Sequence, residues 1–240
     1  MEGNGALLSV RDVHNYYGDS YVLQGVSLDV DRGQVAVLMG RNGVGKTTTI
    51  RTVVGLTPAR RGSIAFNGEE LTRLPTHEIA RRGVGLVPQG RRVFGSLTVR
   101  EHLSAASNRK RKETWTLERI FDVFPRLKER LQQRAVHLSG GEQSMLAIAR
   151  ALRTEPECLL MDEPTEGLAP LFVDIVLEVV QGLQATGELG ILIVVHELPI
   201  ALAIADHVYV MGKGHMVFDG PPEELERRRD IQERYIGVGV

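Results

Sequence analysis

A glycine-rich octapeptide at residues 40–47 restricts the folds that this chain can adopt. It reads Gly-Arg-Asn-Gly-Val-Gly-Lys-Thr and matches the pattern G-x-x-x-x-G-K-[ST]. The apolar run before it, 34–39, predicts a strand buried on both faces, and the pattern after it predicts a helix over 47–54. Glycines at these spacings let successive backbone N–H groups face inward at a helix start, which is a geometry that holds phosphate. We therefore expect a phosphate-binding loop between a core strand and a helix.

Further apolar runs predict a parallel sheet. Residues 84–87, 158–161 and 191–195 are as apolar as 34–39, and helical patterns, including an amphipathic one over about 170–185, separate them. Buried strands that alternate with helices are typical of a mostly parallel sheet with helices on both faces. Residues 207–218 predict a hairpin that turns at residues 212–214.

Two other segments predict additions to this sheet. Residues 6–10 and 26–30 alternate apolar and polar side chains, as strands covered on one face do, and predict an antiparallel layer near the N-terminus. The charged, Arg-rich stretch 89–137 has a helical period and lies between two core strands. We therefore expect one domain over 1–240, in which a helical subdomain at 89–137 is inserted into a core formed by 1–88 and 138–240.

Composition excludes several classes of protein. The 240 residues carry 29 Lys and Arg against 30 Asp and Glu, so the net charge of −1 argues against nucleic acid as a partner. Cys158 is the only cysteine, which excludes an internal disulfide. No apolar run approaches the roughly 20 residues that a membrane helix needs, and the first ten residues lack the pattern of a secretory signal. These features predict a soluble, cytoplasmic α/β protein.

An acidic pair follows the run 158–161. A strand in the sheet core would deliver Asp162 to the water shell of a Mg²⁺ ion opposite the phosphate loop. Glu163 points elsewhere and is placed to polarise a water in line with a γ-phosphate. Lys46 would reach the β- and γ-phosphates, and the Thr47 hydroxyl would hold the same Mg²⁺.

A second helix start carries a distinctive hexapeptide, Leu-Ser-Gly-Gly-Glu-Gln at 138–143. Ser139 with Glu142 three residues later predicts a capping box, and the helix N-terminus there is a second candidate anion site. The hexapeptide resembles the signature motif of ABC-type ATPases. The order phosphate loop, Gln89, signature, acidic pair and His196 is also theirs. The resemblance implies a P-loop NTPase core of the ABC ATPase type and covers nearly the whole chain.

The resemblance implies a role for each matching residue. The residues expected to bind ATP are Tyr17, Gly40, Arg41, Asn42, Gly43, Val44, Gly45, Lys46, Thr47 and Thr48. The catalytic set is Lys46, Gln89, Glu163 and His196, and the Mg²⁺ ligands are Thr47, Gln89 and Asp162. Ser139, Gly140, Gly141 and Glu142 would act on the ATP of a second subunit, so that two chains enclose two ATP molecules.

At one position two residues compete for the family role, and at another the chain departs from the family pattern. Tyr17, before Gly18, resembles the aromatic residue that stacks on adenine, but Tyr16 beside it is an alternative. After residues 162–165 many family members continue Ser-Ala-Leu-Asp, whereas this chain has Ala169 where the aspartate stands. Coupling of the two ATP sites through that carboxylate is therefore in doubt.

Several stretches resemble the ATPase subunits of importers for branched-chain amino acids, urea or short amides. These stretches are 90–94, 97–99, 124–130, 167–170 and 234–237. The resemblance implies a homodimer or a pair with a paralogous ATPase. It also implies two transmembrane permease subunits that dock near Gln89 to Phe94, an indirect solute-binding protein, and a peripheral location on the cytoplasmic side of the membrane. The alternatives are a soluble ABC-type ATPase outside transport and the ATPase subunit of an exporter.

Overall fold

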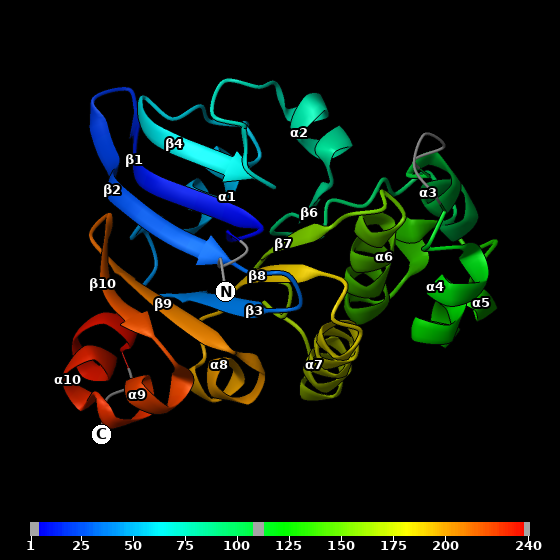
Figure 1. Cartoon of the computed structure of the whole chain (residues 1–240). Coiled ribbons are helices and arrows are strands. Elements are labelled where there is room, and N and C mark those ends of the chain that lie inside the picture. Colours follow the sequence, from blue (N-terminus) through cyan, green and yellow to red (C-terminus); the bar gives the residue numbers. More distant parts are fainter. Residues whose placement is uncertain (1–4, 108–112, 238–240) are drawn as a thin grey trace.

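Two β-sheets organise the chain in the computed structural model, which describes residues 5–107 and 113–237 (Figure 1). The larger sheet has the strand order β10-β9-β3-β8-β7-β6 and is parallel except for β10, which pairs antiparallel with β9. Its strands are β3 (Val35–Met39), β6 (Val84–Val87), β7 (Cys158–Asp162), β8 (Gly190–Val194), β9 (His207–Gly212) and β10 (His215–Gly220). The predicted, mostly parallel sheet and its terminal hairpin are confirmed.

The smaller sheet is antiparallel, with the strand order β2-β1-β4-β5. Its strands are β1 (Leu8–Tyr17), β2 (Ser20–Val30), β4 (Arg61–Phe66) and β5 (Glu69–Glu70). The predicted N-terminal antiparallel layer is confirmed, but β1 and β2 are about twice as long as the patterns at 6–10 and 26–30 indicate. The register shifts between Val10 and Val13, where Asp12 has φ 47°, and this irregularity breaks the two-residue alternation.

The central strands are buried on both faces, and the alternation of side chains assigns each face to a separate core. In β3, Ala36 and Leu38 pack with the antiparallel sheet, whereas Val35, Val37 and Met39 pack with the helices on the other side. The strands β7 and β8 are divided in the same way. A fully apolar run is therefore required here, because neither face of the sheet meets water.

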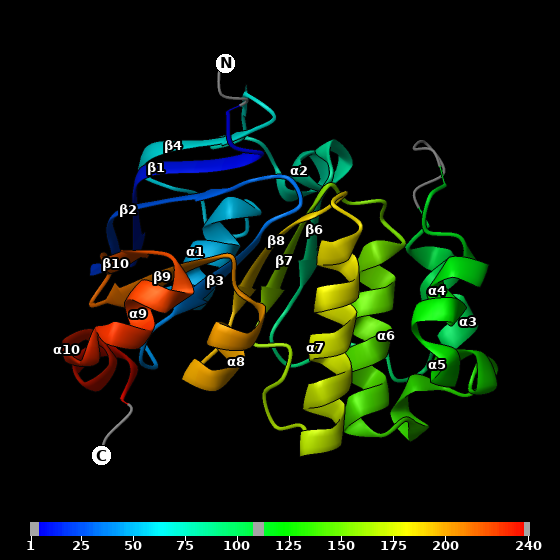
Figure 2. The same ribbon diagram turned by 60° about the horizontal axis from the view of Figure 1, so that its bottom comes forward.

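Helices fill both sides of this sheet (Figure 2). Helix α1 (Lys46–Val53) lies between the two sheets, and α6 (Gly140–Leu152), α7 (Pro170–Ala185) and α8 (Leu198–Ile204) cover the opposite face. The helices predicted over 47–54 and about 170–185 are confirmed as α1 and α7. The other helices flank the sheets: α2 (Thr76–Arg82) precedes β6, and α9 (Pro222–Arg227), α10 (Arg229–Ile231) and the π-helical turn η2 (Gln232–Ile236) lie beside β9 and β10.

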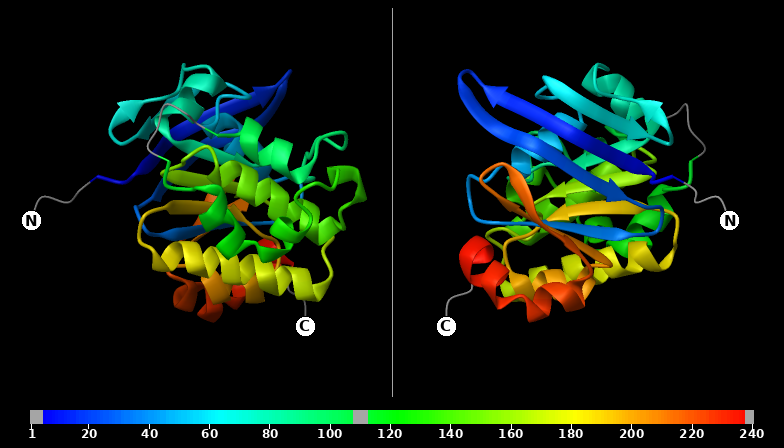
Figure 3. Two further views of the ribbon diagram at one scale, coloured as in Figure 1. Left: turned by 90° about the vertical axis from the view of Figure 1, so that its right-hand side faces the viewer. Right: turned by 60° about the vertical axis from the view of Figure 1, so that its left-hand side comes forward.

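The segment predicted as a helical insertion lies to one side of α6 (Figures 1 and 3). It contains α3 (Val99–Ala105), α4 (Leu117–Val123), α5 (Pro125–Glu129) and the 3₁₀ turn η1 (Ala135–His137). Thr98 and Thr116 cap α3 and α4 through their side chains. The buried side chains of these helices join the apolar cluster of α6 and the parallel sheet. The proposed boundaries at 89 and 137 stay a prediction, and residues 108–112 lie outside the described residues.

The described part of the chain contains no helix that is long and apolar enough to cross a membrane.

Alanine substitutions at two glycines are expected to change the free energy of unfolding in opposite directions. Gly62 has φ +90°, and a Cβ there would lie 2.4 Å from the Asp12 carbonyl oxygen, so we expect Gly62→Ala to destabilise the fold by more than about 2 kcal/mol. Gly182 lies exposed within α7 with no atom near the position of a Cβ, so Gly182→Ala should stabilise by about 0.5–1 kcal/mol. Urea unfolding of both variants measures this. Equal effects would contradict the geometry at Gly62.

Candidate functional site

The phosphate loop is shaped by three glycines in left-handed or related conformations. Gly40, Gly43 and Gly45 have φ 137°, 80° and 116°. A Cβ at Gly40 would lie 2.5 Å from the Met211 carbonyl oxygen, so no other residue fits there without a shift of backbone. The loop borders a cleft of about 260 Å³ whose lining residues are Val22, Asn42, Gly43, Gly45, Lys46, Thr47, Thr48, Gln89, Glu163 and Glu166. The sequence-predicted phosphate loop and two of the predicted catalytic residues outside it thus share one cleft.

Lys46 is held inside its own loop. Its Nζ donates to the carbonyl oxygens of Gly40 at 2.8 Å and Arg41 at 3.1 Å. Burial lowers the pKa of Lys46, and the nearby carboxylates of Glu163 and Asp162 oppose that shift. The ammonium group is therefore poorly solvated where it stands, and it gains a stronger partner when a phosphate enters the cleft.

Asp162 and Thr47 meet at the predicted metal position. Asp162 is the last residue of β7, and its Oδ1 accepts a hydrogen bond of 3.1 Å from the Thr47 hydroxyl. Burial raises the pKa of Asp162, the neighbouring Glu163 adds to this, and the Thr47 hydrogen bond opposes it. A hydroxyl and a carboxylate at the edge of a phosphate loop are the oxygen donors that Mg²⁺ prefers, so these residues fit the predicted metal.

Glu163 lies at the centre of the predicted catalytic residues. It has φ 52°, a conformation that a non-glycine residue adopts at a cost. Its Oε1 lies 2.6 Å from His196 Nε2, and its Oε2 accepts a hydrogen bond of 2.9 Å from Gln89 Nε2. Three residues that the sequence places 74 and 33 positions apart thus form one hydrogen-bonded group.

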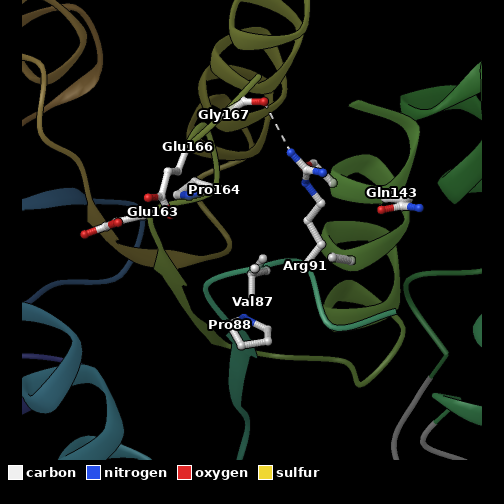
Figure 4. Close-up of a pocket in the computed structure, with 11 residues that line it drawn as sticks. Val87, Pro88, Arg91, Gln143, Glu163, Pro164, Glu166 and Gly167 are labelled. Atoms are coloured by element: carbon white, nitrogen blue, oxygen red, sulfur yellow. Dashed lines mark hydrogen bonds between the residues drawn. The ribbon is translucent and has the colours of Figure 1, made fainter. Parts of the chain in front are cut away.

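Glu166 is a functional candidate that sequence reasoning missed. Gln89 Nε2 also donates to Glu166 Oε2 at 3.0 Å, so one amide joins two carboxylates. Glu166 lines the phosphate-loop cleft and a second cavity of about 300 Å³ beside it (Figure 4). The available signal was a third carboxylate three residues after Glu163, but only the fold shows that it faces Gln89.

The signature segment begins α6 as predicted. Ser139 accepts from the Glu142 N–H, and the Glu142 carboxylate accepts from the Ser139 N–H, so the capping box is complete. The two glycines between them face different neighbours. A Cβ at Gly141 would lie 2.0 Å from the ring of Phe172 on α7, and a Cβ at Gly140 would lie 2.9 Å from the Arg91 guanidinium. The signature segment does not line the phosphate-loop cleft of its own chain.

The structure separates Tyr16 from Tyr17. The Tyr16 ring stacks on Tyr21 across the β1–β2 pair at 4.4 Å, and the Arg60 guanidinium lies over the Tyr16 ring. Tyr17 is 43% exposed and lines a cavity of about 350 Å³ with Gln89 and Asp162, but it does not line the phosphate-loop cleft. Of the two rings, only that of Tyr17 is open to a base.

Comparison with known proteins decides the family. Residues 23–166 match the ABC transporter family. The chain belongs to that family. It is 40% identical over 233 residues to the high-affinity branched-chain amino acid transport ATP-binding protein BraG of Pseudomonas aeruginosa, across 96% of this chain and 100% of that protein.

Two further similarities cover almost the full length of this ABC protein. It is 33% identical over 241 residues to the lipopolysaccharide export system ATP-binding protein LptB of Escherichia coli, which covers 97% of this chain and 98% of that one. A solved nucleotide-free ATP-binding cassette from an ABC transporter has a TM-score of 0.83 and 28% identity, with 98% and 99% of the two chains covered. The family resemblance stated from the sequence is confirmed, and the chain is an ATP-binding subunit that hydrolyses ATP.

The signature glycines of this ABC ATPase allow a matched test of packing. Gly141→Ala forces the Phe172 ring to move, so we expect a loss of about 1–3 kcal/mol in unfolding free energy. Gly140→Ala meets only the end of a flexible arginine, so its cost should stay below about 1 kcal/mol. Urea unfolding compares the two, and Phe172→Ala combined with Gly141→Ala should recover part of the loss. Equal costs for both glycines would show that the Phe172 contact does not matter.

Proposed function

We propose that this chain is the ATP-hydrolysing subunit of an importer, and that it powers uptake of branched-chain amino acids, urea or related small polar solutes. The observation that carries the catalytic part is the Gln89–Glu163–His196 group, in which Gln89 and Glu163 line the phosphate-loop cleft and His196 contacts Glu163. The cargo rests on the 40% identity to BraG, whose name specifies branched-chain amino acid transport. The cargo never touches this subunit, so its identity is an inference from similarity.

The residues of one chain divide the work on ATP. The N–H groups of the loop 40–47 and the Lys46 ammonium bind the phosphates, Thr48 adds a hydroxyl at the helix start, and Tyr17 stacks on the base. Thr47, Asp162 and Gln89 would hold Mg²⁺, which would offset phosphate charge. Glu163 accepts a proton from the attacking water, and His196 holds the carboxylate in place at 2.6 Å.

The second half of each site comes from another copy or a paralogue. In this proposal Ser139, Gly140, Gly141 and Glu142 present the N-terminus of α6 to the γ-phosphate of the partner's ATP. Only a triphosphate bridges both subunits, so hydrolysis reopens the dimer. Ala169 brings no carboxylate to the partner, which leaves Glu166 and the backbone of the turn at 166–169 to contact it.

Two permease subunits dock on the segment Gln89 to Phe94. Phe94 is 62% exposed, yet its N–H donates to Nε2 of the buried His102 at 2.9 Å. A large apolar ring that is exposed and held in place is suited to contact a partner. In this arrangement the subunit is peripheral, on the cytoplasmic side of the membrane, and it acts on a solute-binding protein only indirectly.

Export is the second candidate, because LptB is also 33% identical over nearly the whole chain. A pull-down separates the candidates. Tagged Glu163→Gln protein is expressed in its native host, gently solubilised with ATP, and its companions are identified. Polytopic permeases with a solute-binding protein support import, and uptake of labelled leucine, urea and short amides in a deletion strain then identifies the cargo. Permeases with envelope-bridging proteins indicate export, and soluble companions alone indicate an ABC ATPase outside transport.

Glu163→Gln tests the shared-site proposal in the purified protein. The amide cannot accept the proton of the attacking water, so we expect hydrolysis to fall by roughly two orders of magnitude or more. ATP should still bind and should drive dimer formation, which light scattering after gel filtration measures. Glu223→Gln, the same change on α9, serves as the control. A Glu163→Gln protein that stays monomeric at saturating ATP would refute the shared site.

Lys46→Ala tests the phosphate loop. The change removes the charge aimed at the β- and γ-phosphates, so ATP affinity should fall roughly tenfold or more and turnover should be lost. Titration with a fluorescent ATP analogue measures the affinity. Lys128→Ala removes an equal charge from the exposed face of α5 and should leave affinity unchanged. Normal affinity and turnover in Lys46→Ala would overturn the phosphate-loop assignment.

A further inference from the structure

The segment after Gln89 has an unusual backbone. Gly90, Arg91 and Arg92 have φ 76°, 62° and 44°, so three consecutive residues lie in the left-handed region. Two of them carry long side chains, which this region disfavours. Such strain persists only where surrounding contacts hold it. The contacts that hold this segment are therefore informative.

The backbone of the segment is held by α6. Arg150 donates from Nη1 to the Arg92 carbonyl oxygen at 2.9 Å and from Nη2 to the Arg91 carbonyl oxygen at 3.4 Å. Burial lowers the pKa of Arg150. Its guanidinium also lies 5.8 Å from the centre of the Phe94 ring. One arginine of α6 thus holds both the strained turn and the exposed aromatic ring that follows it.

The Arg91 side chain runs in the opposite direction, toward the N-terminus of α6. Its Nη2 donates to the Gly167 carbonyl oxygen at 3.4 Å (Figure 4). Its guanidinium lies against Gly140, because a Cβ built there would be 2.9 Å from Nη1 and 3.2 Å from Cζ. Arg91 therefore contacts the first glycine of the signature segment and the turn that follows the acidic pair at the same time.

These contacts border the cavity of about 300 Å³ that also opens onto Glu163 and Glu166. The contact of Phe172 with Gly141 packs the start of α6 against α7, whereas this space separates it from the turn at 164–167. Arg91 is the side chain that crosses it, and its planar group presents several N–H donors at once.

We propose that Arg91 is a positioning residue that joins the Gln89 segment to the two segments a second subunit must meet, the signature start at Gly140 and the turn at Gly167. This role rests on the proposed shared site. The contacts of Arg91 described above join it to Gly140, Gly167 and α6 and not to the phosphate loop, so its contribution belongs to dimer closure and not to binding of nucleotide by a single chain. Movement of the Gln89 segment then reaches both segments through one guanidinium.

The test compares variants in the Glu163→Gln protein. We expect Arg91→Ala to raise the ATP concentration at half-dimerisation roughly three- to tenfold, as the loss of a charge-assisted hydrogen bond would do. Affinity of the single chain for ADP should change less than about twofold, since the phosphate loop is untouched. Arg91→Gly keeps the left-handed turn and should match Arg91→Ala. Arg91→Lys keeps the charge but not the planar fork and should recover less than half of the effect.

The control is Arg126→Ala, which removes an exposed arginine from α5 without touching the segment. In the wild-type background, Arg91→Ala should raise the KM for ATP by a similar factor, because hydrolysis requires the same closed dimer. An unchanged dimerisation midpoint would overturn the role of Arg91, and so would a parallel loss of ADP affinity, which would indicate a general effect on folding. If Glu163→Gln alone fails to dimerise, both the shared site and the role of Arg91 are refuted. If Glu163→Gln dimerises equally well with and without the Arg91 side chain, only the role of Arg91 is refuted.

Discussion

Burial of the central sheet on both faces determines where this protein can place charge. Strands β3, β7 and β8 are fully buried, and their alternate side chains belong to two separate apolar cores. Polar groups can emerge only where the strands end. The order β3-β8-β7 sets three carboxyl ends side by side, and the phosphate loop, His196 and the pair Asp162–Glu163 lie at these ends. The site is thus a consequence of the sheet.

The charged groups Lys46 and Asp162 at these strand ends have neutral hydrogen-bond partners. Burial disfavours the charged forms of both Lys46 and Asp162, and each is held by neutral partners: two loop carbonyls for the lysine and a hydroxyl for the aspartate. A polyphosphate would give Lys46 a negatively charged partner, and a divalent cation would give Asp162 a positively charged one. ATP with Mg²⁺ would therefore replace weak partners by strong ones at both positions.

Short-range patterns in the sequence predicted the sheet, the phosphate loop and the capping box of α6, because each depends on neighbouring residues. Contacts between distant segments were not predictable in this way. The left-handed conformation of Glu163 and its contacts with Gln89 and His196 have no signal in residue order, and neither does the position of Glu166. Tyr16 and Tyr17 look alike in the sequence, and only the cross-strand stack of Tyr16 on Tyr21 distinguishes them. The irregularity at Asp12 interrupts the alternation of apolar and polar residues, so the alternation predicted only about half the length of β1.

The two signature glycines show that one motif can satisfy packing and function together. Gly141 is small because the Phe172 ring fills the space beside it, and Gly140 leaves room for the flexible end of Arg91 on another side. A helix start contacted in this way by α7 and by the Gln89 segment cannot move independently of either. If the N-terminus of α6 meets the phosphate of a second subunit, its position at that phosphate depends on the positions of α7 and the Gln89 segment. The requirement for glycine then follows from coupling between segments as much as from access of phosphate to the backbone.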